Sequence, residues 1–231
     1  MVNSPANPDP AHRVATAIEL LVRQGYDSTS VGDLAGATGM SRSTFFRKFG
    51  SKEDIVFADH DRILEKVREE LSRTSKDPLR TVVDAALLVF EHHVGNRETS
   101  LARYELLQQV PALRDRELVM THRYQRAFRS YLRGALPEAG NREVIAVTFA
   151  ASVVALHNSV LREWLRSGTE EDLTRRLARD LGILADTFAG LLRGSDGPGS
   201  TPAGRAAVVV TVLERAADNE AILQAVREAL G

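Results

Sequence analysis

Basic and hydroxyl-bearing side chains gather in one short stretch of the chain. Between Gly39 and Lys52 there is no acidic residue and there are four basic ones, Arg42, Arg47, Lys48 and Lys52. Because the 231 residues together carry a net charge of −1, this positive patch is local, and it would attract phosphate groups. The first part of this stretch also carries polar side chains able to reach base edges in a major groove: Ser41, Arg42, Ser43 and Thr44. The stretch predicts contact with DNA.

Two short helices must position these residues. Ser30 and Asp33 have the spacing of a capping box, so a helix is expected to begin there and to stop at Gly39. Ser41 is expected to cap a second helix that runs to about Lys48. Two short helices joined by a turn with a glycine have the dimensions of a helix-turn-helix.

The order of residues in 29–35 and 38–53 resembles the TetR family of transcriptional regulators. The resemblance covers roughly the first 60 residues in sequence and the rest only in helix order and size. It implies phosphate contacts from Thr29 or Ser30, Arg47, Lys48 and Lys52, and base contacts from Arg42, Ser43 and Thr44. Phe46 departs from the family, which often has tyrosine there, so it is expected either to contact a thymine methyl or to pack.

Helical periodicity dominates the remaining sequence. Apolar residues recur three and four positions apart and 43% of the chain is hydrophobic, which predicts an all-α protein. We expect a helix-turn-helix domain at 1–51 and a ligand-binding and dimerisation domain at 52–193. A single long helix from Lys52 to about Ser75 would join them. Residues 194–204 have the composition of a flexible linker, and 205–231 predict a helical tail of unknown role.

Two helices in the second half carry the expected dimer interface. Apolar residues cover every face of the helix between Val144 and Leu161, and a helix capped by Thr169 carries leucines at three- and four-residue steps. Two such helices per subunit would form a four-helix bundle across a two-fold axis, although a buried spine within one subunit is the alternative. The interface residues expected are Ala151, Ala155, Leu177, Leu181, Leu184 and Phe188.

A ligand pocket is expected in the second half of the chain. The segments 101–107 and 110–114 resemble acyl-CoA-type ligand-binding domains of the TetR family, which implies an apolar or anionic amphipathic effector that releases a homodimeric repressor from a palindromic operator. Eight arginines between 97 and 133 could hold an anion. A cationic lipophile, with Glu91, Glu105 and Glu163 as counter-charges, is the rival. The residues expected to line the pocket, each of which could also be plain core, are Arg103, Tyr104, Tyr124, Phe128, Tyr131, Phe149, His157 and Trp164.

Other function classes find little support in the sequence. The chain has no cysteine, no glycine-rich phosphate loop, no His-Glu-x-x-His motif and no serine in a nucleophile elbow. Adjacent His92 and His93 would point about 100° apart on a helix, so they are poorly placed to share a metal. We therefore expect no enzyme, metal or cofactor, no membrane segment, and a cytoplasmic location. A helical adaptor that no longer binds DNA is a further alternative.

Overall fold

The computed structural model describes residues 10–73, 77–138, 140–167 and 173–194, and every regular element within them is a helix. This confirms the all-α prediction. The expected cap Thr169, the tail 205–231 and all of the linker beyond Gly194 lie outside the described residues. The helices are α1 Pro10–Gln24, α2 Val31–Ala37, α3 Arg42–Phe49, α4 Lys52–Val56, α5 Ala58–Ser72, α6 Pro78–Gly95, α7 Arg97–Gln109, α8 Pro111–Ala135, α9 Arg142–Ser167 and α10 Leu173–Gly194.

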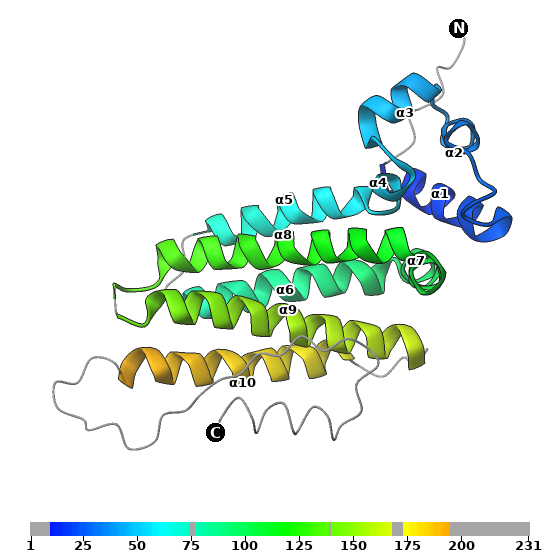
Figure 1. Cartoon of the computed structure of the whole chain (residues 1–231). Coiled ribbons are helices and arrows are strands. Elements are labelled where there is room, and N and C mark those ends of the chain that lie inside the picture. Colours follow the sequence, from blue (N-terminus) through cyan, green and yellow to red (C-terminus); the bar gives the residue numbers. More distant parts are fainter. Residues whose placement is uncertain (1–9, 74–76, 139, 168–172, 195–231) are drawn as a thin grey trace, which may run out of the picture. The chain divides into compact units, whose positions relative to one another are not determined.

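Helices α1 to α4 form a head (Figure 1), and its buried apolar residues join those of α7 and α8 in one cluster. The expected caps are present: Ser30 and Asp33 make a reciprocal capping box on α2, and the Ser41 hydroxyl accepts a hydrogen bond from the Thr44 amide at the start of α3. Gly39, in the turn between the helices, has φ +67°, a backbone angle that residues other than glycine rarely adopt. The core of the head includes Ile18, Leu21, Leu34, Phe45 and Ile55.

The long connecting helix expected from Lys52 is interrupted. Its first turn is α4, and α5 begins after Phe57, whose backbone (φ −114°, ψ 11°) is not helical. The carbonyl of Val56 accepts a hydrogen bond from Nε of Arg103 at 2.9 Å, so a side chain from α7 occupies a backbone acceptor at the end of α4. The aromatic ring of Phe57 is buried at the break. The arginine that bonds at this interruption lies 47 residues away in the sequence, so the local pattern did not indicate it.

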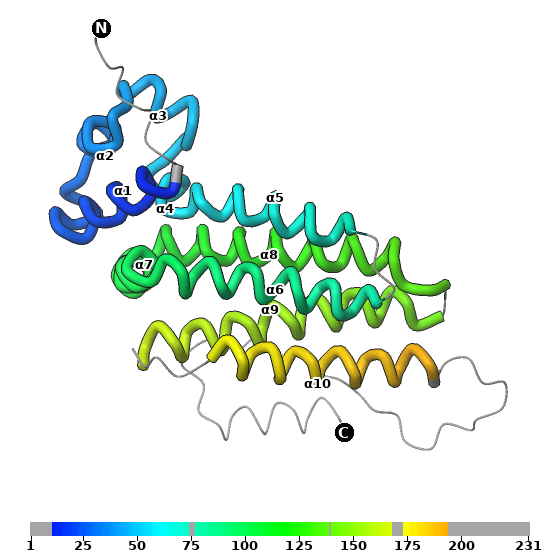
Figure 2. The backbone as a smooth tube through the Cα atoms, turned by 180° about the vertical axis from the view of Figure 1, so that it is seen from behind, coloured from blue at the N-terminus to red at the C-terminus, as the bar shows by residue number. Residues whose placement is uncertain are grey.

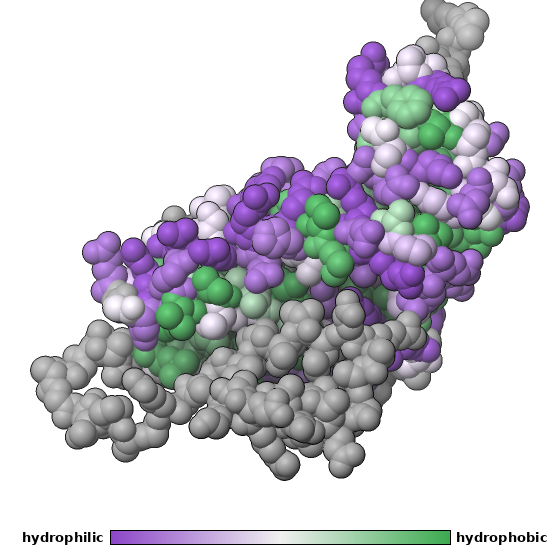
Figure 3. Space-filling model, viewed as in Figure 1, coloured by the Kyte–Doolittle hydropathy of each residue, from purple (hydrophilic) through white to green (hydrophobic). Residues whose placement is uncertain are grey.

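The body consists of α5 to α10. Helices α5, α6, α8, α9 and α10 lie side by side in packed rows, and α7 runs across their end beside α1 (Figures 1 and 2). Fully buried side chains fill the space between the rows, among them Leu64, Phe90, Phe128, Phe149 and Leu177. The face shown in Figure 3 is mainly hydrophilic over α5 and α8, with apolar side chains in small groups.

The sequence predicted no membrane segment, but helix α9 is long and apolar enough to cross a membrane. By length and composition it meets that criterion, with a window of mean hydropathy 1.9. It packs against α6, α8 and α10, and nine of its residues are buried there. The share of that window buried inside the subunit is 44%, and one helix of this kind does not by itself indicate a membrane segment.

The residues expected at a dimer interface divide into two groups. Leu177, Leu181 and Phe188 are buried in the core of their own subunit, with the Phe188 ring 5.2 Å from that of Phe149. Ala151 and Leu184 are partly buried and Ala155 is exposed. The apolar residues that α9 and α10 leave most exposed are Val144, Ile183 and Leu191. The leucine seam of α10 therefore faces inward, and the exposed apolar residues of α9 and α10 are not those expected at the interface.

Candidate DNA-binding surface and effector pocket

Helix α3, the second helix of the helix-turn-helix, presents most of its polar residues to solvent. Ser41 Oγ lies 2.9 Å from Thr44 Oγ1 and 3.0 Å from Ser43 Oγ, so the hydroxyls at the start of α3 form one connected cluster. Phe45 is fully buried and anchors the helix, with its ring 5.2 Å from that of Phe49. The exposed residues of the helix are those expected to face DNA: Arg42, Ser43, Phe46, Arg47 and Lys48.

Phe46 is neither a core residue nor a free apolar side chain. It is 44% exposed, and the Arg42 guanidinium lies 5.7 Å from its ring centroid. An arginine over an aromatic face is partly held in place by the cation–π attraction. The ring thus supports the side chain that is expected to read bases, and it remains accessible to a thymine methyl.

Three other predicted contacts make bonds inside the head. Lys52 Nζ donates to the backbone oxygens of Tyr26 at 2.9 Å and Thr29 at 3.2 Å, and it lies 4.2 Å from the Tyr26 ring. The Thr29 side chain is fully buried and donates to the Gly25 carbonyl. Ser30 is exposed, with its hydroxyl used in the capping box. Of the two alternatives, Thr29 or Ser30, only Ser30 is at the surface.

The body contains a cavity of about 90 Å³ that is partly open to solvent. Its wall is contributed by α5 to α9 together with Phe57. Apolar side chains predominate, among them Val89, Leu107, Phe128, Val154 and Leu161. Ligand sites are commonly apolar clefts with a few polar groups, and the lining of this cavity has that character.

Five of the eight predicted pocket residues line this cavity: Arg103, Tyr104, Tyr124, Phe128 and His157. Phe149 and Trp164 are buried in the core without lining it, and Tyr131 lines a separate groove between α5 and α8. Sequence reasoning missed His60 and His93, which are buried in the wall. The available signal was a histidine within the apolar stripe of a helix. The two rings contact each other across α5 and α6, and that contact depends on how the helices pack.

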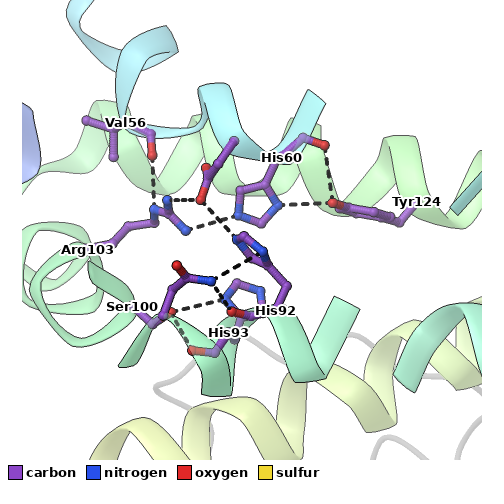
Figure 4. A network of polar contacts seen from close by, with 9 residues as sticks. Val56, His60, His92, His93, Ser100, Arg103 and Tyr124 are labelled. Carbon is purple, nitrogen blue, oxygen red and sulfur yellow. Dashed lines mark hydrogen bonds and ion pairs between the residues drawn. The ribbon is translucent and has the colours of Figure 1, made fainter. Parts of the chain in front are cut away.

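Arg103 is the centre of a buried polar network (Figure 4). Besides the Val56 carbonyl, its guanidinium contacts Asp59 Oδ2 at 2.6 Å and His60 Nε2 at 3.2 Å. The other nitrogen of His60 lies 3.1 Å from the Tyr124 hydroxyl, and His92 Nε2 lies 3.3 Å from Asp59 Oδ2. One arginine therefore joins the end of α4, the first turn of α5 and the cavity wall.

Burial sets the protonation states in this network. It lowers the pKa of both His60 and His157 to about 4 and lowers the pKa of His93 as well, so all three imidazoles are neutral near pH 7. For Asp59 burial acts to raise the pKa, but the Arg103 guanidinium and the hydrogen bond from His92 outweigh it and hold that pKa well below its usual range. The wall thus combines neutral rings with one buried ion pair.

The arginines expected to clamp an anion are mostly engaged with carboxylates. Arg103 pairs with Asp59, Arg116 with Asp54 and Arg123 with Asp61, each at 2.6 Å, while Arg129 and Arg133 share Glu143. At the cavity, Arg162 lies 3.8 Å from Glu117, and both are partly exposed. The glutamates expected to meet a cation, Glu91, Glu105 and Glu163, do not line the cavity. Within the described residues no group of three potential ligands is placed to hold a metal ion.

A helix-turn-helix head on a helical body that contains a cavity is an arrangement suited to a DNA-binding regulator. Residues 14–58 match the tetR family of bacterial regulatory proteins, and residues 77–189 match the MftR C-terminal domain. The chain belongs to the TetR family, whose members are transcriptional regulators rather than enzymes.

Individual relatives agree with this assignment. The chain is 29% identical over 161 residues to a protein described as a mycofactocin biosynthesis transcriptional regulator, MftR, from Mycobacterium tuberculosis, covering 68% of this chain and 80% of that one. The fold is similar to that of FadR from Bacillus subtilis, crystallised with stearoyl-CoA (TM-score 0.54, 16% identity, 76% of this chain and 97% of that chain). A TetR-family regulator from Syntrophomonas wolfei is also similar (TM-score 0.58, 18% identity, 77% and 95% of the two chains).

Proposed function

We propose that this protein is a cytoplasmic repressor that binds a palindromic operator as a homodimer and is released by a small apolar or anionic amphipathic effector, such as an acyl-CoA. One observation carries the proposal: Arg103 lines the cavity and also holds the last carbonyl of α4, the helix that leads into the DNA-binding head. An effector that moves Arg103 acts directly on the head.

The coupling follows from the contacts of Arg103. Its bonds to Val56, Asp59 and His60 all lie at the junction of α4 and α5, next to the buried ring of Phe57, which also faces the cavity. A ligand pressing on this wall would favour a different position of α4 and so a different separation of the two heads in a dimer. Because such coupling is reciprocal, operator DNA should weaken effector binding by the same factor.

The cavity chemistry supports an effector with a large apolar part. The apolar wall suits an acyl chain. The crystal structure of FadR in complex with stearoyl-CoA is a precedent for such a ligand in this fold. An anionic end would find Arg162 at the exposed part of the wall, where its ion pair with Glu117 is long. A cationic lipophile is the second candidate, because Glu117 in the same pair offers a counter-charge.

Dimerisation is proposed through the outer faces of α9 and α10. Val144 and Ile183 are 62% and 60% exposed, and Ala155 leaves room for close helix approach. In a two-fold dimer each stripe would meet its copy, and the recognition helices would lie about 34–36 Å apart or a multiple of that spacing. Ile183→Arg should yield monomers in light scattering at micromolar concentration, whereas Thr187→Arg, one turn further along α10, tests how wide the contact is.

Operator release is the experiment that tests the proposal. Duplexes selected in vitro from a random library would be bound by the full chain, and anisotropy would follow release by stearoyl-CoA, stearate and a cationic dye such as rhodamine 6G. Release by stearoyl-CoA or stearate, with a matching thermal shift, is expected. Release by the dye alone would overturn the proposal of an anionic or apolar effector but would leave the assignment as a DNA-binding regulator standing. Failure to select any duplex would favour a helical adaptor that does not bind DNA.

A further inference from the structure

His157 is a polar residue in the cavity wall that the rest of the protein leaves incompletely bonded. It lies in the middle of α9, is 7% exposed and packs edge-on against Phe90 with ring centroids 5.8 Å apart. Its Nε2 atom is buried and has no hydrogen-bond partner among the described residues. Of the other two cavity histidines, His60 is bonded through both ring nitrogens, and His93 Nδ1 lies 3.4 Å from the Ser100 hydroxyl.

The bonding of the other ring nitrogen fixes what Nε2 can do. Nδ1 of His157 lies 3.2 Å from the side-chain oxygen of Asn158, and a carbonyl oxygen can only accept. Nδ1 therefore carries the proton. A neutral imidazole has one N–H, so Nε2 is left with a lone pair and acts as an acceptor. A buried acceptor without a donor costs free energy that a suitable ligand would recover.

The charges of the wall narrow the kind of donor. Arg103 is neutralised by Asp59, and Arg162 faces Glu117, so the charged lining residues cancel in pairs. An ammonium group placed at His157 would lose its hydration without gaining a counter-charge there. A carboxylate would set its own lone pairs against that of Nε2. The group that fits is an uncharged donor.

We infer that the effector carries a hydroxyl or amide N–H on its buried, largely apolar body and donates it to Nε2 of His157. The inference rests on the proposed function, in that the cavity is taken to be the effector site. It adds a selection rule: of two apolar ligands equal in shape, the one with a donor at this position binds more tightly. A charged end, where the effector has one, lies toward the exposed part of the wall.

A matched pair of probes tests this rule. Calorimetry would compare 4-octylphenol with 4-octylanisole, whose methyl ether has no donor, on the wild-type full chain and on His157→Phe. The wild type should prefer the phenol about two- to tenfold, the range of a neutral hydrogen bond, and His157→Phe should bind the two equally. Thr121→Val, which removes a different hydroxyl from the wall, is the matched control and should keep the preference.

A second measurement does not depend on the variant folding. In wild-type protein labelled with 15N-histidine, the phenol should shift the Nε2 resonance of His157 and the anisole should not. Equal affinity of the wild type for both probes, or loss of the preference in Thr121→Val but not in His157→Phe, would overturn the inference and leave the repressor proposal standing. Failure of both probes to bind, together with operator release by stearoyl-CoA, would likewise reject a donor site at His157. Absence of release by every compound would count against the proposed function itself.

Discussion

The DNA-binding head and the cavity wall are built from polar residues in opposite ways. The residues proposed to meet DNA lie close together in the sequence, most of them at the surface, and rest on an apolar core that the head shares with α7 and α8. The residues of the cavity network are buried and come from helices far apart in sequence, as in the contact of Arg103 with Val56 across 47 positions. A change in the head should therefore alter binding with little effect on stability, while a change in the network should alter both.

Removing the buried arginine gives the largest expected effect. Arg103→Met leaves Asp59 as an uncompensated buried charge, and breaking a buried pair in this way costs about 3–5 kcal/mol of unfolding free energy. Arg123→Met breaks an ion pair of the same length to Asp61, which is mostly exposed, and should cost less than about 1 kcal/mol. Urea denaturation measures both. The double variant Arg103→Met/Asp59→Leu should recover much of the loss; equal costs for the two single variants would contradict this account of the network.

Acid should act on the buried histidines next. Their pKa is lowered in the folded state, to about 4 for His60 and His157, so the unfolded chain takes up protons first as the pH falls below about 6.5. Stability is therefore present in full above pH 6.5 and declines toward pH 4, by about 1–2 kcal/mol for each of these two residues at pH 5. Urea denaturation between pH 7 and pH 5 would measure the slope. His157→Phe should reduce it and the exposed His122→Gln should not, whereas a flat profile would mean that these imidazoles are not buried.

In the head, Arg42→Ala should change DNA recognition without changing stability. If Arg42 contacts a base, operator affinity falls by about 1–3 kcal/mol while affinity for unrelated duplexes changes much less. Phe46→Ala should reproduce part of the loss, since the ring supports the guanidinium. Arg193→Ala, exposed at the far end of α10, is the control. Equal loss for operator and unrelated DNA in Arg42→Ala would assign the residue to phosphates instead.

The sequence predicted the head well because its determinants are local. The caps Ser30 and Ser41 and the turn at Gly39 act on residues within a few positions, and the structure has each of them where expected. The break at Phe57 could not be predicted, because the arginine that captures the Val56 carbonyl belongs to α7. The same holds for His60 and His93, whose place in the cavity wall depends on how α5 and α6 pack.

The leucines of α10 illustrate a different limit. Their spacing correctly indicated a continuous apolar seam, but spacing alone does not say whether a seam meets another helix of the same chain or of a partner. Leu181 turned out to pack inside the subunit, and the exposed residue Ile183 lies only two positions away. Two positions on a helix correspond to about 200° of rotation, so Leu181 and Ile183 lie on nearly opposite faces of α10.

Replacement of Lys52 has the smallest expected effect on stability, and it distinguishes a contact with DNA from a contact inside the head. The family resemblance assigns it to a phosphate, whereas its ammonium group is held by two backbone carbonyls and the Tyr26 ring. If these contacts persist on DNA, Lys52→Met should cost about 1 kcal/mol of stability, since its partners are partly open to water, and should leave the salt dependence of operator binding almost unchanged. Arg47→Met, exposed on α3, should instead lower that slope by about one with no loss of stability. A unit drop in slope for Lys52→Met at constant stability would show that the lysine leaves its internal partners to bind a phosphate.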